Sequence, residues 1–326
     1  MNISVALCTY NGAKFLREQL ESIRAQTVLP CELVICDDRS TDDTPSIIEK
    51  FAEAAPFPVR VVVNEQNLGS TRNFEKAIGL CSGDLIFLAD QDDIWHSAKL
   101  DAMGAVFTRS PSVGLVFTDG ELIDEDSRPS GRRLWDYTFP QKERKRVGPG
   151  EFYKTLSSRN VVTGATAAFR RDFLDDIFPF PVHIPNLVHD DWIALVISLC
   201  AEISFFDTPM ISYRMHAGQQ VGVHELGNPT SSAIENLAWT LGNLRNHRLA
   251  FGASAERLQH IEGVRDRLAR LEMELDEYSA HLEKRIELLQ AGYVRRVPLL
   301  VREVLSGRYS RHSRALLSPL KDLLNR

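Results

Sequence analysis

The sequence predicts an α/β protein with a doubly wound, mostly parallel sheet and a C-terminal helical appendage. Two observations support this prediction. Short apolar runs alternate with segments of helical periodicity four times within the first ~90 residues, which is the pattern of consecutive βαβ units. From about residue 230 these short runs give way to long segments with apolar residues at helical spacing.

The first four expected strands are apolar runs bounded by polar turn residues. In chain order they cover residues 3–8, 32–36, 59–63 and 84–89. Apolar residues three or four positions apart indicate helices between them, at 15–23, 41–51 and 74–78. A helix at 97–109 and a strand at 113–118 continue the alternation. In such a sheet the carboxyl ends of the strands form the edge where ligands bind.

The later elements are less regular. Residues 127–150 are polar with a basic cluster, so either a mobile excursion over the site or a solvated loop is expected. A helix is expected at 193–199, and short strands at 203–206 and 210–214. Near-heptad apolar spacing predicts one helix over 253–290. Such a helix would be ~57 Å long and would pack in a hairpin with 230–250 or pair with another subunit as a homodimer.

These patterns divide the chain into an α/β domain at 1–222 and a helical region at 223–326. The net charge of −6 hides an asymmetry, because residues 292–326 carry +6 and the remainder −12. The acidic remainder argues against general nucleic-acid binding. The basic tail also contains many leucines and valines, so it is expected to be either a docked helix pair or a peripheral contact with a membrane.

Composition also bears on the compartment. The five cysteines lie in or beside apolar runs without metal-ligand spacing, which indicates a reducing environment. The N-terminus enters a strand pattern directly, and no apolar run approaches the ~20 residues that span a bilayer. We therefore expect a cytoplasmic protein, with any contact at the inner face of the cell membrane made through 292–326.

Three carboxylates within four positions follow the apolar run at 84–89. If the strand continued, Asp90 and Asp92 would project to the same side. Carboxylates crowded this closely repel one another unless a cation lies between them. A solvated acidic turn is the ordinary alternative for an isolated pair. Two further acidic pairs, Asp37-Asp38 and Asp190-Asp191, also follow apparently buried segments, and this recurrence favours a metal-dependent site.

Several motifs occur in a fixed order along residues 1–222. They are Cys8–Gly12, Ile35–Asp42, Asn67–Phe74, Asp90–Trp95, Thr163-Gly164, His189–Trp192 and Tyr213–His216. This series resembles the family 2 glycosyltransferases of the GT-A fold, a Rossmann-like nucleotide-sugar-binding fold. It is most similar to bacterial enzymes of O-antigen or cell-wall polysaccharide synthesis, including rhamnosyltransferases. The helical region matches this family poorly.

The resemblance implies an inverting transfer of a sugar from a dTDP- or UDP-sugar donor to a hydroxyl of a saccharide or lipid-linked acceptor. It also implies a Mg²⁺ or Mn²⁺ ion, which would act as a Lewis acid on the leaving diphosphate. By resemblance Asp90 and Asp92 hold this ion, with Asp92 the direct ligand and Asp93 in support. His216 lies after the last strand and could ligate the metal or contact the diphosphate, with an ordinary surface histidine as the alternative.

The resemblance further assigns the donor pocket. Asp38 would accept a hydrogen bond from the ring N–H of uracil or thymine, and Arg72 or Asn73 would lie near the diphosphate. The donor-binding residues implied in this way are Thr9, Tyr10, Asn11, Asp38, Arg72, Asn73, Asp90 and Gln91.

The catalytic base is expected at the motif His189–Trp192. An acceptor hydroxyl is a poor nucleophile near neutral pH, so a positioned carboxylate must take its proton. Family members commonly have Glu-Asp here. If His189 occupies the Glu position, the base is Asp190. If Asp190-Asp191 is aligned with the family's Glu-Asp pair, the base is Asp191. Asp190 is preferred. Acids in a first helical turn are also favoured by the helix dipole alone, so simple capping is the alternative.

Two other functions compete with glycosyl transfer. A nucleotidyltransferase of related fold usually carries a glycine-rich phosphate-binding run near its N-terminus, and Thr9–Gly12 does not provide one. A non-catalytic scaffold would act through the helical tail. The acids at three strand ends argue against such a scaffold, because a degenerate site has no need of them.

Overall fold

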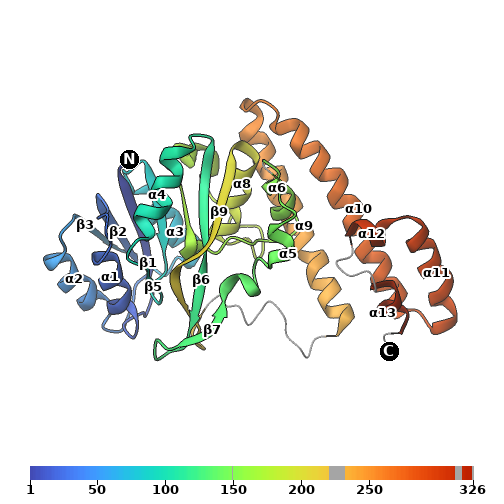
Figure 1. The fold of residues 1–326 in the computed structure, drawn as a ribbon, viewed down its shortest axis with the longest axis horizontal. Coiled ribbons are helices and arrows are strands. Elements are labelled where there is room, and N and C mark those ends of the chain that lie inside the picture. The colour runs from blue at the N-terminus through green and yellow to red at the C-terminus, as the bar shows by residue number, and fades with distance from the viewer. Residues whose placement is uncertain (149, 220–231, 313–317, 325–326) are drawn as a thin grey trace. The chain divides into compact units, whose positions relative to one another are not determined.

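The computed structural model describes residues 1–148, 150–219, 232–312 and 318–324. The chain forms an α/β unit, comprising Met1–Leu156 and Asn160–Leu226, and a helical unit, comprising Ser157–Arg159 and Gly227–Arg326. Figure 1 shows the elements of both units. The boundary expected between residues 222 and 223 lies outside the described residues.

One mixed sheet forms the α/β unit, in the order β3-β2-β1-β4-β8-β6-β9-β5, with β7 paired to β6. The strands are β1 (Ile3–Thr9), β2 (Glu32–Asp37), β3 (Val59–Val63), β4 (Leu85–Ala89), β5 (Ile94–Trp95), β6 (Val113–Ile123), β7 (Pro129–Arg133), β8 (Ala167–Arg170) and β9 (Glu202–Arg214). β1 is parallel to β2 and β4, and β2 is parallel to β3. The expected α/β class, with a mostly parallel N-terminal sheet, is confirmed.

The helices of this unit follow the expected alternation. They are α1 (Leu16–Arg24), α2 (Thr44–Ala54), α3 (Ser70–Gly79), α4 (Lys99–Arg109), α5 (Gln141–Arg144), α6 (Phe152–Leu156), α7 (Leu174–Ile177) and α8 (His189–Cys200). α3 packs on β1 and β2 and also contacts α8. Every residue of β1 and β4 is buried, which explains why both strands are continuous apolar runs in the sequence.

The second half of the sheet departs from a purely parallel arrangement. β8 lies between β4 and β6 and is antiparallel to both, whereas β6 and β9 are parallel. The two short strands expected at 203–206 and 210–214 are one continuous strand, β9. Its pairing with β6 shifts register between Thr118 and Gly120, so the strand continues through the irregular segment that separates the two apolar runs.

The expectation of a mobile or solvated loop at 127–150 is wrong for its described part. This segment contains β7 and α5, and it buries Trp135 and Phe139. Both rings pack in a cluster with Phe117, Phe152 and Phe205. Because most neighbouring residues in the sequence are charged or polar, the burial of these two aromatic side chains could not be predicted.

The helical unit contains α9 (Ala233–Arg257), α10 (Val264–Gln290), α11 (Tyr293–Leu305), α12 (Arg308–His312) and α13 (Ser318–Leu324). α9 and α10 pack against each other as the expected hairpin. The expectation of a single helix over 253–290 is wrong. The chain turns between α9 and α10 at Gly263, whose φ of 77° lies in the left-handed region. Ser232 caps α9 by accepting a hydrogen bond from the Glu235 N–H.

Among the described residues, no helix is long and apolar enough to cross a membrane. The leucines of the near-heptad pattern that are buried within α10 are Leu268, Leu271, Leu275, Leu282 and Leu289. Pairing of this helix with a second subunit stays a prediction.

Candidate active site

The loop after β1 is held by the loop after β2. The Thr9 hydroxyl donates to Asp37 Oδ1 at 2.7 Å. Asn11 has a positive φ of 47°, a conformation that asparagine tolerates. Its N–H donates to Ser40 Oγ at 2.8 Å, and its Oδ1 accepts from the Thr41 N–H at 2.8 Å. These reciprocal contacts fix the two strand-end loops against each other.

The side-chain amide of Gln91 joins the β1 loop to the acidic motif after β4. Its Oε1 accepts from the Tyr10 N–H at 2.8 Å, and its Nε2 donates to the Tyr10 carbonyl at 3.1 Å. A Cβ at Gly12 would lie 2.1 Å from Gln91 Oε1, so only glycine leaves room for this amide. Both polar ends of Gln91 therefore bind the Tyr10 backbone, while the Tyr10 side chain is exposed.

The Asp38 carboxylate is buried at the end of β2. Its Oδ1 accepts from Asn64 Nδ2 at 2.8 Å and from the Leu68 N–H at 2.7 Å, and its Oδ2 accepts from the Gly69 N–H at 2.8 Å. An ionised carboxylate offers about four acceptor sites. The three internal bonds position the loop before α3 and leave room for one further donor.

The two candidates for the diphosphate on α3 differ in environment. Asn73 is buried, its Nδ2 donates to the Cys36 carbonyl at 2.8 Å, and its Oδ1 accepts from Asn64 Nδ2 at 2.8 Å. Arg72 is exposed. In this structure the Asn73 side chain therefore braces the ends of β2 and β3, whereas Arg72 is accessible to a ligand.

Asp92 and His216 meet although they are distant in the sequence. Asp92 Oδ2 lies 2.8 Å from His216 Nε2, and both side chains are partly accessible. His216 Nδ1 accepts from the Gly218 N–H at 3.2 Å, which favours the tautomer with the proton on Nε2. In this arrangement His216 donates to Asp92.

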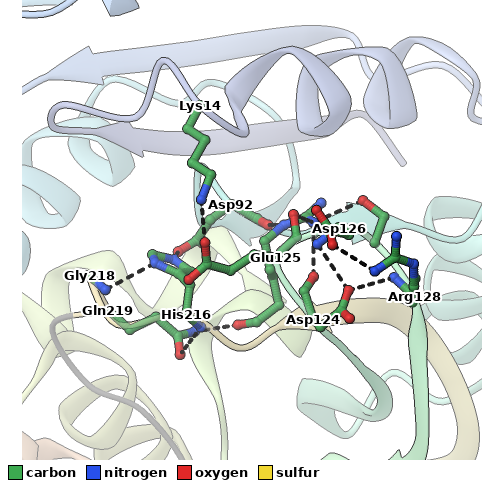
Figure 2. A network of polar contacts seen from close by, with 11 residues as sticks. Lys14, Asp92, Asp124, Glu125, Asp126, Arg128, His216, Gly218 and Gln219 are labelled. Atoms are coloured by element: carbon green, nitrogen blue, oxygen red, sulfur yellow. Dashed lines mark hydrogen bonds and ion pairs between the residues drawn. The ribbon is translucent and has the colours of Figure 1, made fainter.

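A turn between β6 and β7 flanks this pair, as Figure 2 shows. Its Glu125 forms an ion pair with Lys14 from the segment before α1. On the other side, Gln219 Nε2 donates to the carbonyl of Arg214 at 2.5 Å. His216 thus lies between the β6–β7 turn and the N-terminal loops.

Arg214, at the end of β9, is fully buried and connects these segments. Its backbone N–H donates to Asp93 Oδ1 at 3.0 Å, and its Nε donates to the Asp92 carbonyl at 2.7 Å. The guanidinium also donates to the Asp124 and Glu125 carbonyls, Ser127 Oγ and Glu18 Oε2. The guanidinium thereby forms an ion pair with Glu18 of α1.

Lys99 is a buried cation beneath the acidic motif. Its Nζ donates to the Ala165 carbonyl at 2.5 Å and lies 3.7 Å from the centroid of the Trp95 ring. Burial lowers the pKa of Lys99, while the charges of Asp93 and Asp90 oppose that change. Sequence reasoning missed this residue, because a lysine at the start of a helix resembles a surface residue.

Asp190 begins α8 and is held by backbone donors. Its Oδ2 accepts from the Gly164 N–H at 2.7 Å, and its Oδ1 accepts from the Asp191 N–H at 2.7 Å and from Asn160 Nδ2 at 3.2 Å. A Cβ at Gly164 would lie 3.0 Å from His189 Nε2 and 3.4 Å from Asp190 Oδ2. The Thr163-Gly164 motif and the His189–Trp192 motif therefore meet at this helix start.

Burial and mutual repulsion raise the pKa values of three carboxyl groups at this edge. Burial, followed by the charges of Asp92 and Asp190, raises the pKa of Asp90 to about 7. Burial and then the charge of Asp191 raise the pKa of Asp190 to about 7. Burial likewise raises the pKa of Asp93. Asp190 binds the N–H of Gly164, and the turn Gly164–Thr166 packs against β4, so the end of β4 and the start of α8 face a common region.

The structure thus brings Asp90, Asp92, Asp190 and His216 to one edge of the sheet. Asp191 is buried beside them in α8. Within the described parts of the chain, no three His, Cys, Asp or Glu side chains form a ready-made cation site. Mg²⁺ is commonly held by one or two carboxylates together with substrate phosphates, so Asp90 and Asp92 fit a cation that arrives with a diphosphate.

The fold is a mixed α/β fold of the GT-A class, with acidic side chains at one edge of its sheet. Residues 4–178, more than half of the chain, match the model of Glycosyl transferase family 2. The chain belongs to this family.

Its relatives include proteins with assigned activities. The dTDP-rhamnosyl transferase RfbG of Shigella flexneri is 26% identical over 231 residues, which are 67% of this chain and 74% of that protein. An uncharacterized glycosyltransferase of Nostoc sp. is 28% identical over 224 residues, 66% of this chain and 65% of the relative. An uncharacterized protein of Mycobacterium tuberculosis is 29% identical over 218 residues, 66% of this chain but only 59% of the relative's length.

Solved structures share the fold. S. aureus TarS in complex with UDP-GlcNAc has a TM-score of 0.53 and 20% identity, and the match covers 79% of this chain and 72% of that chain. The mannosyltransferase PcManGT from Pyrobaculum calidifontis, in complex with GDP-Man and Mn²⁺, has a TM-score of 0.54 and 20% identity, with 96% and 81% covered. At these identities the likeness concerns the fold.

Proposed function

We propose that this protein transfers a sugar from a nucleoside-diphosphate donor, a dTDP- or UDP-sugar, to a hydroxyl of a saccharide or lipid-linked acceptor in surface polysaccharide synthesis. The observation that supports this most directly is the meeting of Asp90, Asp92, Asp190 and His216 at one edge of the sheet, where His216 contacts Asp92 and Asp190 binds the turn that packs against β4. The named activity of the relative RfbG and the UDP-GlcNAc bound by TarS support the choice of donor.

A divalent cation fits the acidic motif. Asp90 and Asp92 supply the hard oxygen ligands that Mg²⁺ and Mn²⁺ prefer, and burial, followed by the charges of Asp92 and Asp190, raises the pKa of Asp90. When bound, the cation neutralises charge on the leaving diphosphate. The hydrogen bond from the Gly218 N–H to Nδ1 favours a proton on Nε2 of His216, so its proposed role is to donate to a diphosphate oxygen.

Asp190 is the proposed base. The acceptor oxygen forms a bond to the anomeric carbon, the bond from that carbon to the diphosphate oxygen breaks, and its electron pair leaves with the nucleoside diphosphate. Asp190 takes the hydroxyl proton, and the attack from the opposite side inverts the anomeric centre. A pKa of about 7 suits a general base near neutral pH. Asp190 is also less buried than Asp191, which supports it over the alternative.

The test measures release of nucleoside diphosphate from a panel of nucleotide sugars with and without Mn²⁺. We expect Asp92→Ala and Asp190→Asn each to lower kcat by about 10²–10⁴-fold. Asp175→Asn removes an exposed carboxylate of α7 and serves as the matched control, with unchanged turnover. Wild-type turnover that neither site substitution reduces would overturn the proposal.

The same assay separates glycosyl transfer from nucleotidyl transfer. A nucleotidyltransferase forms a nucleotide sugar from a sugar phosphate and a nucleoside triphosphate, and it therefore releases pyrophosphate. We expect no pyrophosphate from that pair of substrates. Melting temperatures of the protein with each nucleotide sugar would identify the preferred base and sugar, since a ligand that binds the folded state raises the midpoint.

A further inference from the structure

Helix α11 has two chemically different faces. On its inner face Glu303 is buried, with Oε1 2.8 Å from His281 Nδ1 of α10 and Oε2 3.2 Å from Arg308. Arg296 also points inward, because its guanidinium donates to the carbonyls of Leu289 and Ala291. These contacts attach one side of α11 to the helical unit and leave the other side outward.

The outward face of α11 is an apolar stripe. Val297, Val301, Val304 and Leu305 have exposed fractions of 44, 51, 44 and 81%. Their spacing of four, three and one residues places them on one side of a helix. Four large apolar side chains are thus exposed on one side of a helix of 13 residues. Exposed apolar patches of this kind mark surfaces that bind a partner.

The charges beside this stripe have a single sign. Arg295 and Arg302 are exposed and lie seven residues apart, so they occupy the same border of the stripe. The only acid of α11, Glu303, lies on the inner face with His281 and Arg308. The outward face is therefore apolar and cationic, without a carboxylate.

We propose that the outward face of α11 lies on an anionic lipid surface. An interfacial helix places its apolar side chains at the boundary of headgroups and acyl chains, while arginines at its border bind lipid phosphates. The chemistry recurs on α13, where Leu320 and Leu324 are exposed and Lys321 lies between them in the sequence. Figure 1 shows α11 and α13 at the C-terminal end of the chain.

A second copy of the chain fits this face less well. A symmetric contact between two α11 helices would pair the same surface with itself. Arg295 and Arg302 of both copies would then border one buried contact, and the outward face of α11 offers no acid to neutralise them. Lipid headgroups supply the missing negative charge.

The test is flotation of the full chain with vesicles, and it does not depend on the proposed enzymatic activity. We expect binding to vesicles of equal parts phosphatidylglycerol and phosphatidylcholine, and binding at least about tenfold weaker to phosphatidylcholine alone or in high salt. Val301→Glu with Leu305→Glu should reduce binding at least about tenfold. Arg295→Gln with Arg302→Gln should reduce it by about fivefold for each arginine.

Met273→Glu provides the matched control, because Met273 is an exposed apolar residue of α10 outside the stripe. It should bind vesicles like the wild type, and all variants should retain the wild-type melting temperature. Absence of wild-type binding, or unchanged binding of the Val301/Leu305 variant, would refute the proposal. If instead light scattering shows a dimer that the Val301/Leu305 substitutions dissociate, with no vesicle binding, the face is an interface between copies.

Discussion

Two neighbouring regions of the α/β unit contrast in how their polar groups are paired. At the ends of β2 and β3 and in α3, buried side chains such as Asp38 and Asn73 find neutral donors and acceptors within the protein. At the end of β4 and the start of α8, Asp90 and Asp190 crowd together and their pKa values rise to about 7. The first region gains stability from its polar groups, whereas the second holds charges together against their repulsion.

This contrast predicts that substitutions in the two regions change the free energy of unfolding in opposite directions. Loss of a paired group in the first region should destabilise the fold at any pH. Loss of a carboxylate in the second should relieve repulsion once the carboxylates are ionised. Arg214, at the end of β9, is an exception beside the second region, because its hydrogen bonds hold the acidic motif after β4 in place.

The largest effect is expected for Arg214→Ala. The substitution removes a fully buried guanidinium and leaves backbone carbonyls of the acidic motif and of the β6–β7 turn without their donor. We expect a loss of about 3 kcal/mol in the free energy of unfolding, measured by urea denaturation. Arg128→Ala, at an exposed arginine of the same turn, is the control. Equal stability of both variants would show that Arg214 does not support the site.

Asn73→Ala should cost about 2 kcal/mol, because the Cys36 carbonyl and the Asn64 amide lose a buried partner. The loss should be the same at pH 5 and pH 8, since no charge is removed. Asn67→Ala, at an exposed asparagine of the adjoining loop, should cost less. A variant of unchanged stability with weaker donor binding would instead support a direct role of Asn73 at the diphosphate.

Asp190→Asn, measured without metal, should have a smaller effect on the free energy of unfolding. This effect should depend on pH and should be stabilising at high pH. Burial, followed by the charge of Asp191, raises the pKa of the Asp190 carboxyl to about 7 in the folded protein, whereas the pKa is near 4 in the unfolded chain. The unfolded chain therefore ionises first, and the free energy of unfolding falls as the pH rises from about 4 to about 7. Relative to the wild type, the variant should be more stable at pH 8 than at pH 5. A pH-independent difference would contradict the raised pKa. Adding Mn²⁺ at pH 8 should stabilise the wild type.

The smallest effect is expected for Lys14→Ala. Its ion pair with Glu125 joins two side chains that are both largely exposed, and such pairs contribute little because water screens them. We expect no measurable change in the urea midpoint. A clear loss of stability would show that the β6–β7 turn depends on this contact, and that the turn belongs to the stabilising region.

The sequence predicted the N-terminal half of the sheet well for a physical reason. Strands covered on both faces require continuous apolar runs, and polar turn residues mark their ends. The family resemblance placed Asp92 and His216 at one cation or diphosphate site, and the two side chains contact each other in the structure. Local patterns of this kind can be read without knowledge of distant contacts.

Other features could not be read in this way. Lys99 and Arg214 are charged yet fully buried, and only tertiary packing distinguishes them from surface residues. The Asn73 side chain donates to the Cys36 carbonyl of β2, which is distant in the sequence. Such a contact cannot be predicted from the residues around Asn73 alone. Trp135 and Phe139 lie in a polar segment, so their burial depends on the cluster around Phe117.

The burial of Arg214 against Asp92 has a consequence for biosynthesis. The two residues are separated by 122 positions, and Arg214 lies in β9, late in the α/β unit. A nascent chain emerging from the ribosome can pair β1 to β4 early, but the guanidinium that secures the acidic loop arrives only after β9 has been translated. Within the α/β unit, the acidic edge is therefore secured last, after the strands β1 to β4 have been translated.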